Sequence, residues 1–241
     1  MTFSISRFWI ASLGAGRTRG HIGMAACPGW ASRSPLEGGA ARDFEQDMSA
    51  VQRWAPNLVL TLLENDEFWE YRVGMLPQTL AARGIPYQHF PLRSDGVPDE
   101  RFAQRWALIS PALRDMLRAG GKLLIHCSDG TLRSGFLAGL LLIEFGCRPE
   151  DALNRVQAVR AGALTVPEQR DYLLRQEQLP RAEPPLPVLH PEIAQVLGGT
   201  AGSAAAQVVR TLAEHSKPAQ AWRGQHDSGA LVDLAKYRQS R

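Results

Sequence analysis

Short apolar runs alternate with amphipathic ones along the chain from about Phe8 to Gln178. Several of the apolar runs have the length and the branched or aromatic residues of β-strands. The run KLLIH follows a Gly-Gly turn, and IPYQHFPL contains two prolines that restrict it to a short or edge strand. The predicted strands are Phe8–Ala11, Asn57–Leu63, Ile85–Leu92 and Lys122–His126.

In the segments between these strands, apolar residues recur at the spacing of helices. One set of apolar residues recurs at steps of three and four positions and shares one helix face: Phe102, Trp106, Ile109, Leu113 and Leu117. Residues Phe136–Phe145 are apolar nearly all round, as in a helix that is buried against a sheet. Prolines suit the first turns of two more helices, Pro149–Val159 and Pro167–Leu174. The alternation predicts an α/β fold with a central, mostly parallel sheet flanked by helices.

The pattern changes after Leu179. Prolines at positions 180, 184, 185, 187 and 191 oppose a regular helix or strand, and Ala204–His215 then shows the spacing of one amphipathic helix. We therefore expect a domain over residues 5–179 and a Pro-rich linker with a partly helical tail over residues 180–241. The tail does not have the pattern of a second enzyme domain.

Composition adds few constraints. A hydrophobic fraction of 44% over 241 residues suffices for a core, and a net charge of +3 is too small to predict a nucleic-acid partner. Arginine supplies nearly all of the basic charge, which suits phosphate ligands but equally follows from genome composition. Three cysteines without framework spacing favour reduced thiols in a cytoplasm. Because no apolar run approaches about 20 residues, we expect a cytoplasmic chain with no membrane partner; its oligomeric state stays open.

The segment that carries chemistry is residues 126–134, HCSDGTLRS. A buried strand delivers Cys127 to a loop of five residues, and Arg133 stands where the next helix begins. Successive N–H groups of such a loop form an anion-binding nest, and the helix directs its positive end to the same place. Arg133 has the geometry to donate two hydrogen bonds to phosphate oxygens. Because the same surroundings favour a thiolate, the segment predicts Cys127 as a nucleophile and Arg133 as a phosphate clamp.

The other loop residues are expected to surround the bound phosphate: Ser128, Asp129, Gly130, Thr131, Leu132 and Ser134. His126 is expected to support the loop from behind, Ser134 to bond the sulfur, and Gly130 to give the backbone its freedom to turn. The chain has no second pair of ligands at zinc spacing and no Cys-x-x-Cys pair, so we predict no metal and no disulfide chemistry. Cys27 and Cys147 are predicted to be buried structural thiols.

A general acid for the leaving oxygen is expected from a different loop. The segment PLRSDGVPD at residues 91–99 follows a predicted strand, and Asp95 in it is the candidate. The alternative is ordinary turn chemistry, in which Ser-Asp-Gly forms a turn and Asp99 caps the following helix.

The motif resembles the signature of the cysteine-dependent protein tyrosine and dual-specificity phosphatases. Three further stretches resemble the kinase-associated phosphatase branch and its bacterial relatives: residues 23–29 (GMAACPG), 89–99 (HFPLRSDGVPD), and 160–169 (RAGALTVPEQ) with the Tyr172-Leu173 pair that follows. The resemblance covers roughly residues 5–178 and leaves the tail unmatched.

The resemblance implies hydrolysis of phosphate monoesters on a phosphoprotein, at Tyr or at Ser/Thr, through a phosphocysteine at Cys127. It implies neither a metal nor an organic cofactor. Asp95 would protonate the departing oxygen. Gln169 falls where some of these enzymes orient the attacking water with a glutamine; the alternative is a glutamine on the surface of a helix.

Two departures from the family pattern keep other functions open. Asp129 and Leu132 occupy loop positions where the family usually has glycine, and without gaps the family's acid aligns with Ser94 rather than with Asp95. The run CSDG also resembles the myotubularin loop, which favours phosphoinositides or another small phosphorylated molecule as a rival substrate class. A pseudophosphatase that binds phosphate without turnover, and the sulfur or arsenate chemistry of rhodaneses and arsenate reductases, are the remaining alternatives.

Overall fold

The computed structural model describes residues 9–16, 18–30, 42–93, 98 and 100–176, which surround a sheet of five strands. The strand order is β1-β2-β5-β3-β4. The first two strands pair antiparallel and all other neighbours pair parallel, so the sheet is mostly parallel as predicted. The strands are β1 (Ala11–Gly14), β2 (His21–Ala25), β3 (Leu58–Thr61), β4 (Tyr87–His89) and β5 (Lys122–His126).

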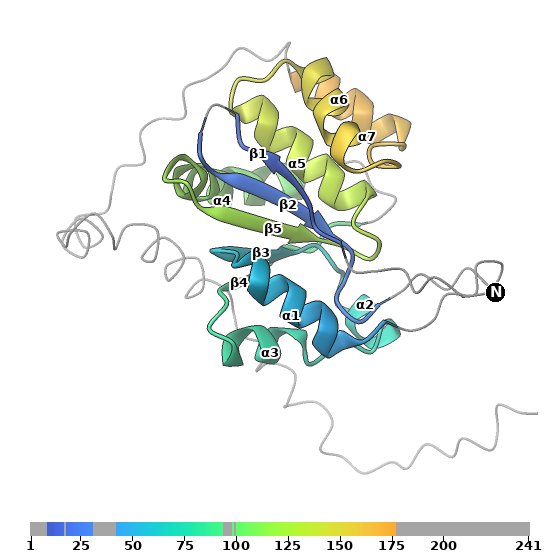
Figure 1. The fold of residues 1–241 in the computed structure, drawn as a ribbon. Coiled ribbons are helices and arrows are strands. Elements are labelled where there is room, and N and C mark those ends of the chain that lie inside the picture. Colours follow the sequence, from blue (N-terminus) through green and yellow to red (C-terminus); the bar gives the residue numbers. More distant parts are fainter. Residues whose placement is uncertain (1–8, 17, 31–41, 94–97, 99, 177–241) are drawn as a thin grey trace, which may run out of the picture.

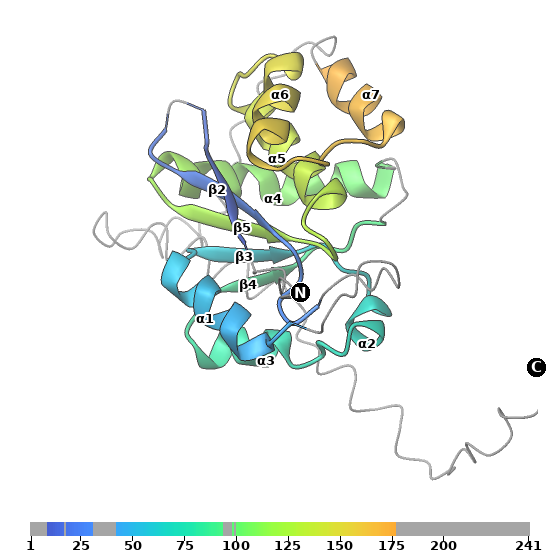
Figure 2. The same ribbon diagram turned by 45° about the vertical axis from the view of Figure 1, so that its right-hand side comes forward.

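Helices cover both faces of this sheet (Figure 1). One group lies on one face, with the shortest of its helices near the carboxyl ends of the parallel strands: α1 (Phe44–Trp54), α2 (Glu67–Glu70) and α3 (Leu76–Ala82). The other group lies on the opposite face: α4 (Glu100–Arg118), α5 (Leu132–Glu144), α6 (Pro149–Val159) and α7 (Pro167–Arg175). The turned view in Figure 2 shows the same two layers of helices on either side of the strands.

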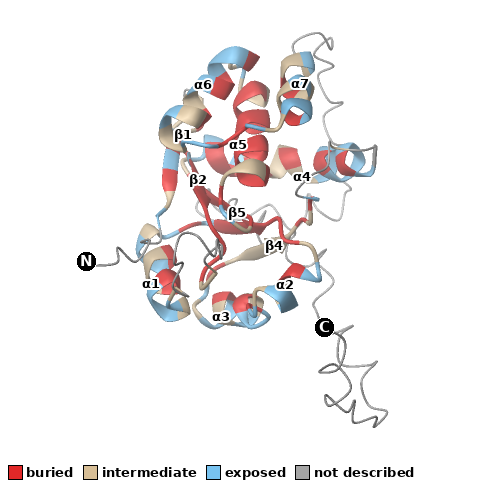
Figure 3. Cartoon of the chain, turned by 90° about the vertical axis from the view of Figure 1, so that its right-hand side faces the viewer, coloured by how far each residue is buried: buried red, intermediate tan, exposed pale blue. Residues whose placement is uncertain are grey.

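Each face of the sheet has its own apolar cluster. Met48 and Leu80 represent the cluster beneath α1 and α3, and Phe136 represents the larger cluster beneath the other group of helices. Residues 133–143 of α5 are all buried, which explains why this helix is apolar all round. Figure 3 shows α5 as the most deeply buried helix, enclosed by its neighbours. The helix that follows the phosphate-loop sequence is therefore fixed by packing on every side.

The structure confirms most of the predicted elements and shifts some of their bounds. β5 and α6 have the predicted limits, and β4 is an edge strand, as its prolines required. The first strand begins at Ala11 rather than Phe8, so only the last residue of the apolar patch Phe8–Ala11 belongs to the sheet. The sequence patterns did not identify β2, nor the helices α1 to α3 between β2 and β4.

Some predictions fall outside the described residues. The tail over residues 180–241, its helix at Ala204–His215 and the boundary at residue 179 stay predictions for this reason. Within the part of the chain that the structure describes, no helix combines the length and the apolar character that a membrane span requires.

Candidate active site

Cys127 lies at the carboxyl end of β5, the central strand of the sheet. The chain then turns through Ser128–Thr131 into α5, which begins at Leu132. Gly130 makes this turn possible: its φ is +74°, and a Cβ there would lie 2.3 Å from the carbonyl carbon of Ala25. The loop is thus pressed against the end of β2, to which the Ser128 carbonyl is also bonded through the Cys27 N–H at 3.0 Å.

Polar groups of the loop and of α5 surround the sulfur of Cys127. The Gly130 N–H donates to Sγ at 3.3 Å, and the Ser134 hydroxyl lies 3.6 Å from it. The thiol donates to Asp129 Oδ1 at 3.5 Å. Cys127 itself is completely buried. The sulfur thus lies against a loop N–H, a hydroxyl at the start of α5 and the carboxylate of Asp129.

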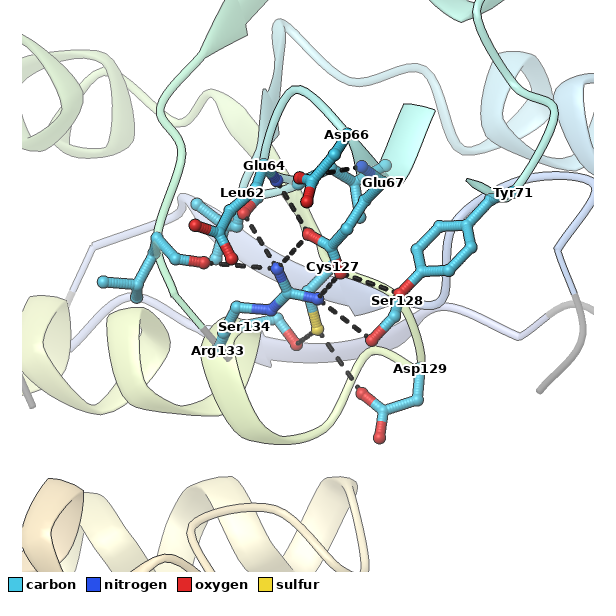
Figure 4. A network of polar contacts seen from close by, with 12 residues as sticks. Leu62, Glu64, Asp66, Glu67, Tyr71, Cys127, Ser128, Asp129, Arg133 and Ser134 are labelled. Carbon is cyan, nitrogen blue, oxygen red and sulfur yellow. Dashed lines mark hydrogen bonds and ion pairs between the residues drawn. The ribbon is translucent and has the colours of Figure 1, made fainter. Parts of the chain in front are cut away.

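Arg133 is buried beside this sulfur and is held by Glu67 of α2 (Figure 4). Nη1 donates to Glu67 Oε2 at 2.5 Å and Nη2 donates to Oε1 at 2.7 Å, which is the bidentate arrangement of guanidinium and carboxylate. Nη1 also donates to the carbonyls of Leu62 and Leu92, both at 3.2 Å, and Nη2 to Ser128 Oγ at 3.1 Å. The guanidinium therefore has one fixed orientation next to Cys127.

Glu67 is ionised at neutral pH in spite of its burial. Burial alone would raise its pKa, but the hydrogen bonds from Arg133, from the Glu64 N–H at 2.7 Å and from the Tyr71 hydroxyl at 2.7 Å hold the pKa below its usual value. Burial and the bond to Glu67 together raise the pKa of Tyr71, whose ring stacks on Trp30 at 4.1 Å. A negative carboxylate thus balances the charge of Arg133.

Sequence reasoning did not identify Glu67 or Tyr71. The signal was available in the topology, because the segment that contains them follows β3, and the carboxyl ends of parallel strands meet at one edge of a sheet. An arginine buried at that edge requires a carboxylate within reach.

His126 lies beneath the loop, fully buried at the end of β5. Its Nε2 is 2.6 Å from the hydroxyl of Thr61 on the neighbouring strand. Burial lowers the pKa of His126 to about 3, so the imidazole is neutral. Its bond joins β5 to β3 below the loop, and its role in supporting the loop stays a prediction.

Asp129 and Thr131 form the outer side of the loop. The Asp129 carboxylate accepts from the Thr131 N–H at 3.1 Å and from its hydroxyl at 2.6 Å. Partial desolvation of this largely exposed side chain would raise the pKa of Asp129, but these bonds and the bond from Cys127 hold it below its usual value. Arg160, at the end of α6, donates to the Asp129 carbonyl at 2.5 Å. Leu132, the remaining predicted loop residue, is the first residue of α5.

Gln169 is completely buried in the first turn of α7, so the alternative of a surface glutamine is wrong. Neither atom of its amide group has a hydrogen-bond partner among the described residues. Because buried amides are normally satisfied, this one has donors and an acceptor left for a water or a ligand.

The structure does not describe every predicted site residue. Asp95 and Ser94 lie outside the described residues, as does Asp99, so the choice of general acid stays a prediction. The described chain before this segment nevertheless contacts the site, because the carbonyl of Leu92 accepts from Arg133.

The other two cysteines and the possible metal ligands lie as follows. Cys27 is buried as predicted, and burial raises the pKa of its thiol. Cys147 is only partly buried, because it lies beyond the end of α5. Within the described ranges, no three His, Cys, Asp or Glu side chains are grouped as metal ligands.

Comparisons with known proteins agree with this architecture. The family model for cyclin-dependent kinase inhibitor 3 (CDKN3) matches residues 5–156. The cyclin-dependent kinase inhibitor 3 of Mus musculus is 28% identical over 154 residues, which make up 63% of this chain and 69% of the mouse protein. The protein of the same name from Homo sapiens is 26% identical over 155 residues, with the same coverage of 63% and 69%.

Two solved structures show the same fold. Kinase-associated phosphatase with its catalytic-site cysteine substituted by serine superimposes with a TM-score of 0.63 at 24% identity, over 73% of this chain and 97% of the other. The active form of the phosphatase Tk-PTP gives a TM-score of 0.51 at 23% identity, over 70% and 98%.

The mostly parallel sheet flanked by helices is the fold of the class to which the family model points, the cysteine-dependent tyrosine and dual-specificity phosphatases. Within that class, the chain belongs to the cyclin-dependent kinase inhibitor 3 family, the kinase-associated phosphatase branch.

Proposed function

We propose that this protein hydrolyses phosphate monoesters on phosphoproteins, at Tyr or at Ser/Thr, through a phosphocysteine on Cys127. The observation that carries the proposal is the placement of the Cys127 sulfur between a loop N–H, the Ser134 hydroxyl and a guanidinium that Glu67 holds in place. The names of the relatives, kinase inhibitor and kinase-associated phosphatase, favour a phosphoprotein as the substrate.

In the first step the thiolate of Cys127 attacks phosphorus. A bond forms between sulfur and phosphorus, and the bond from phosphorus to the ester oxygen breaks. Arg133 and the loop N–H groups stabilise the charge on the phosphoryl oxygens. Asp95 donates a proton to the departing oxygen; support for this role comes from Leu92, three residues earlier, which is bonded to Arg133.

In the second step a water attacks the phosphocysteine. The bond from water oxygen to phosphorus forms, the bond from sulfur to phosphorus breaks, and Asp95 takes up the proton that the water loses. The Ser134 hydroxyl, 3.6 Å from the sulfur, stabilises the departing thiolate. Gln169 orients the water, a role that the unpartnered buried amide supports.

The test is the release of inorganic phosphate from a panel of phosphotyrosine, phosphothreonine and phosphoserine peptides, with phosphoinositides as a second panel. We expect turnover on peptides by the wild type, a loss of more than about a thousandfold in Cys127→Ser, and no loss in the control Cys147→Ser. Turnover on the lipids alone would mean that the substrate is a phosphoinositide rather than a phosphoprotein. Phosphopeptide binding without any release of phosphate would contradict catalysis.

A further inference from the structure

The Asp129 carboxylate contacts both the sulfur of Cys127 and an N–H group of the loop. A single atom, Oδ1, lies 3.5 Å from the sulfur of Cys127 and accepts the Thr131 N–H at 3.1 Å. In Figure 4, Glu67 and Asp129 lie on opposite sides of that sulfur. A phosphoryl group attacked by Cys127 would place an oxygen within reach of the same sulfur and the same loop N–H.

Two donors that hold the Asp129 carboxylate belong to Thr131, two residues further along the loop. Thr131 precedes the first residue of α5, so its N–H lies at the positive end of that helix. Its hydroxyl donates to the second carboxylate oxygen at 2.6 Å. The bonds from Thr131 also hold the pKa of Asp129 below its usual value, so the group is an anion at neutral pH.

The burial of the nucleophile agrees with this arrangement. Cys127 is completely buried, while Asp129, which contacts the sulfur, is exposed. An exposed residue thus directs one carboxylate oxygen to the buried sulfur. A substrate that reaches the sulfur has to move this side chain or bring its own negative charge against it.

We propose that Asp129 is an internal competitor that occupies the anion site of the phosphate loop and that a substrate phosphate has to displace. This inference rests on the proposed function, because it assumes that the loop binds phosphate esters. Phosphate groups that bind by displacing Asp129 give up part of their binding free energy, so the residue sets the affinity of the site for its substrate and for the phosphate product.

The experiment measures the binding of tungstate, a tetrahedral dianion, to the full chain by calorimetry. We expect Asp129→Asn, which keeps the shape and removes the charge, to bind tungstate about tenfold more tightly than the wild type. Asp129→Gly, which removes the whole side chain, is expected to bind at least as tightly as Asp129→Asn. The control Asp151→Asn changes the net charge equally at an exposed site at the start of α6 and is expected to leave the affinity unchanged.

A second readout is the alkylation of Cys127 by neutral iodoacetamide, located by peptide mass mapping. It is expected to be faster in both Asp129 variants, because the carboxylate no longer contacts the sulfur. Tungstate binding that is equal or weaker in both variants would overturn the proposal, and so would equal tightening in Asp151→Asn. If the wild type releases no phosphate while the variants still bind tungstate more tightly, the proposed function fails and the occupancy by Asp129 stands.

Discussion

The two sides of the phosphate loop are stabilised by different interactions: the inner side faces Arg133 and Glu67, and the outer side carries Asp129. On the inner side, Arg133 and Glu67 are both buried, and each terminal nitrogen of the guanidinium donates to a carboxylate oxygen. On the outer side, Asp129 is exposed, and Arg160 donates a hydrogen bond to its backbone carbonyl. Opposite charges are expensive to separate when they are buried and cheap to separate in water. The inner side therefore fixes the geometry of the site. On the outer side, a change of charge costs little stability and alters the affinity of the site for phosphate.

The largest effect is expected from breaking the inner pair. Glu67→Gln leaves Arg133 buried without its counter-charge, which typically costs about 3–5 kcal/mol of unfolding free energy. Urea unfolding measures this loss, and phosphate release should fall with it, since Arg133 loses its fixed orientation. Glu70→Gln, an exposed change in the same short helix, serves as the control. A loss of less than about 1 kcal/mol would mean that the inner pair behaves like a surface ion pair.

A pH dependence distinguishes the buried support beneath the loop from the exposed outer side. The pKa of His126 is about 3 in the folded chain against a usual 6.5, so the unfolded chain binds more protons between these values. Stability from this group is complete above about pH 6.5 and declines as the pH falls, by about 2 kcal/mol between about pH 7 and pH 5. Burial lowers the pKa of His89 too, which adds a loss of the same sign.

Unfolding by urea at several pH values measures this slope. His126→Gln is expected to be less stable at neutral pH but to show a shallower decline, because it has no imidazole to protonate. His21→Gln, a change at an exposed histidine, should keep the slope of the wild type. An unchanged slope in His126→Gln would contradict the assignment to His126.

The smallest effect is expected from Arg160→Gln on the outer side. It removes a hydrogen bond to the Asp129 carbonyl and a stacking contact with Trp9, where Arg160 Cζ lies 5.1 Å from the ring centroid. At this partly exposed position the loss of unfolding free energy should stay below about 1 kcal/mol. Thermal unfolding compares it with Arg175→Gln, an exposed control in α7. A loss as large as that of Glu67→Gln would remove the difference between the two sides.

The sequence was sufficient to predict the elements whose pattern is local. β5 and α5 were predictable because an unbroken apolar run can only be buried, and Gly130 because a tight loop requires a residue that tolerates positive φ. The partner of Arg133 was not predictable in the same way. Glu67 lies 66 positions away, and only the parallel pairing of β3 with β5 brings it to the site.

The burial of Gln169 was also not predictable from the local sequence pattern. Its neighbours in α7 are charged, which is the pattern of a surface helix, yet the packing of α7 against α5 buries it completely. Asp129 was recognisable as a departure from the family loop, but its contact with the Cys127 sulfur depends on how the loop turns, and spacing in the sequence does not specify that turn.

The most direct test of the account is to trap the covalent intermediate. The protein is mixed with a fast aryl phosphate, denatured rapidly, and examined by mass spectrometry of the intact chain and of its peptides. We predict one added phosphoryl group on the peptide that contains Cys127, its absence in Cys127→Ser, and a larger amount in Gln169→Ala, in which water attack is slowed. Release of phosphate that persists in Cys127→Ser, with no adduct on Cys127 in the wild type, would contradict the central claim.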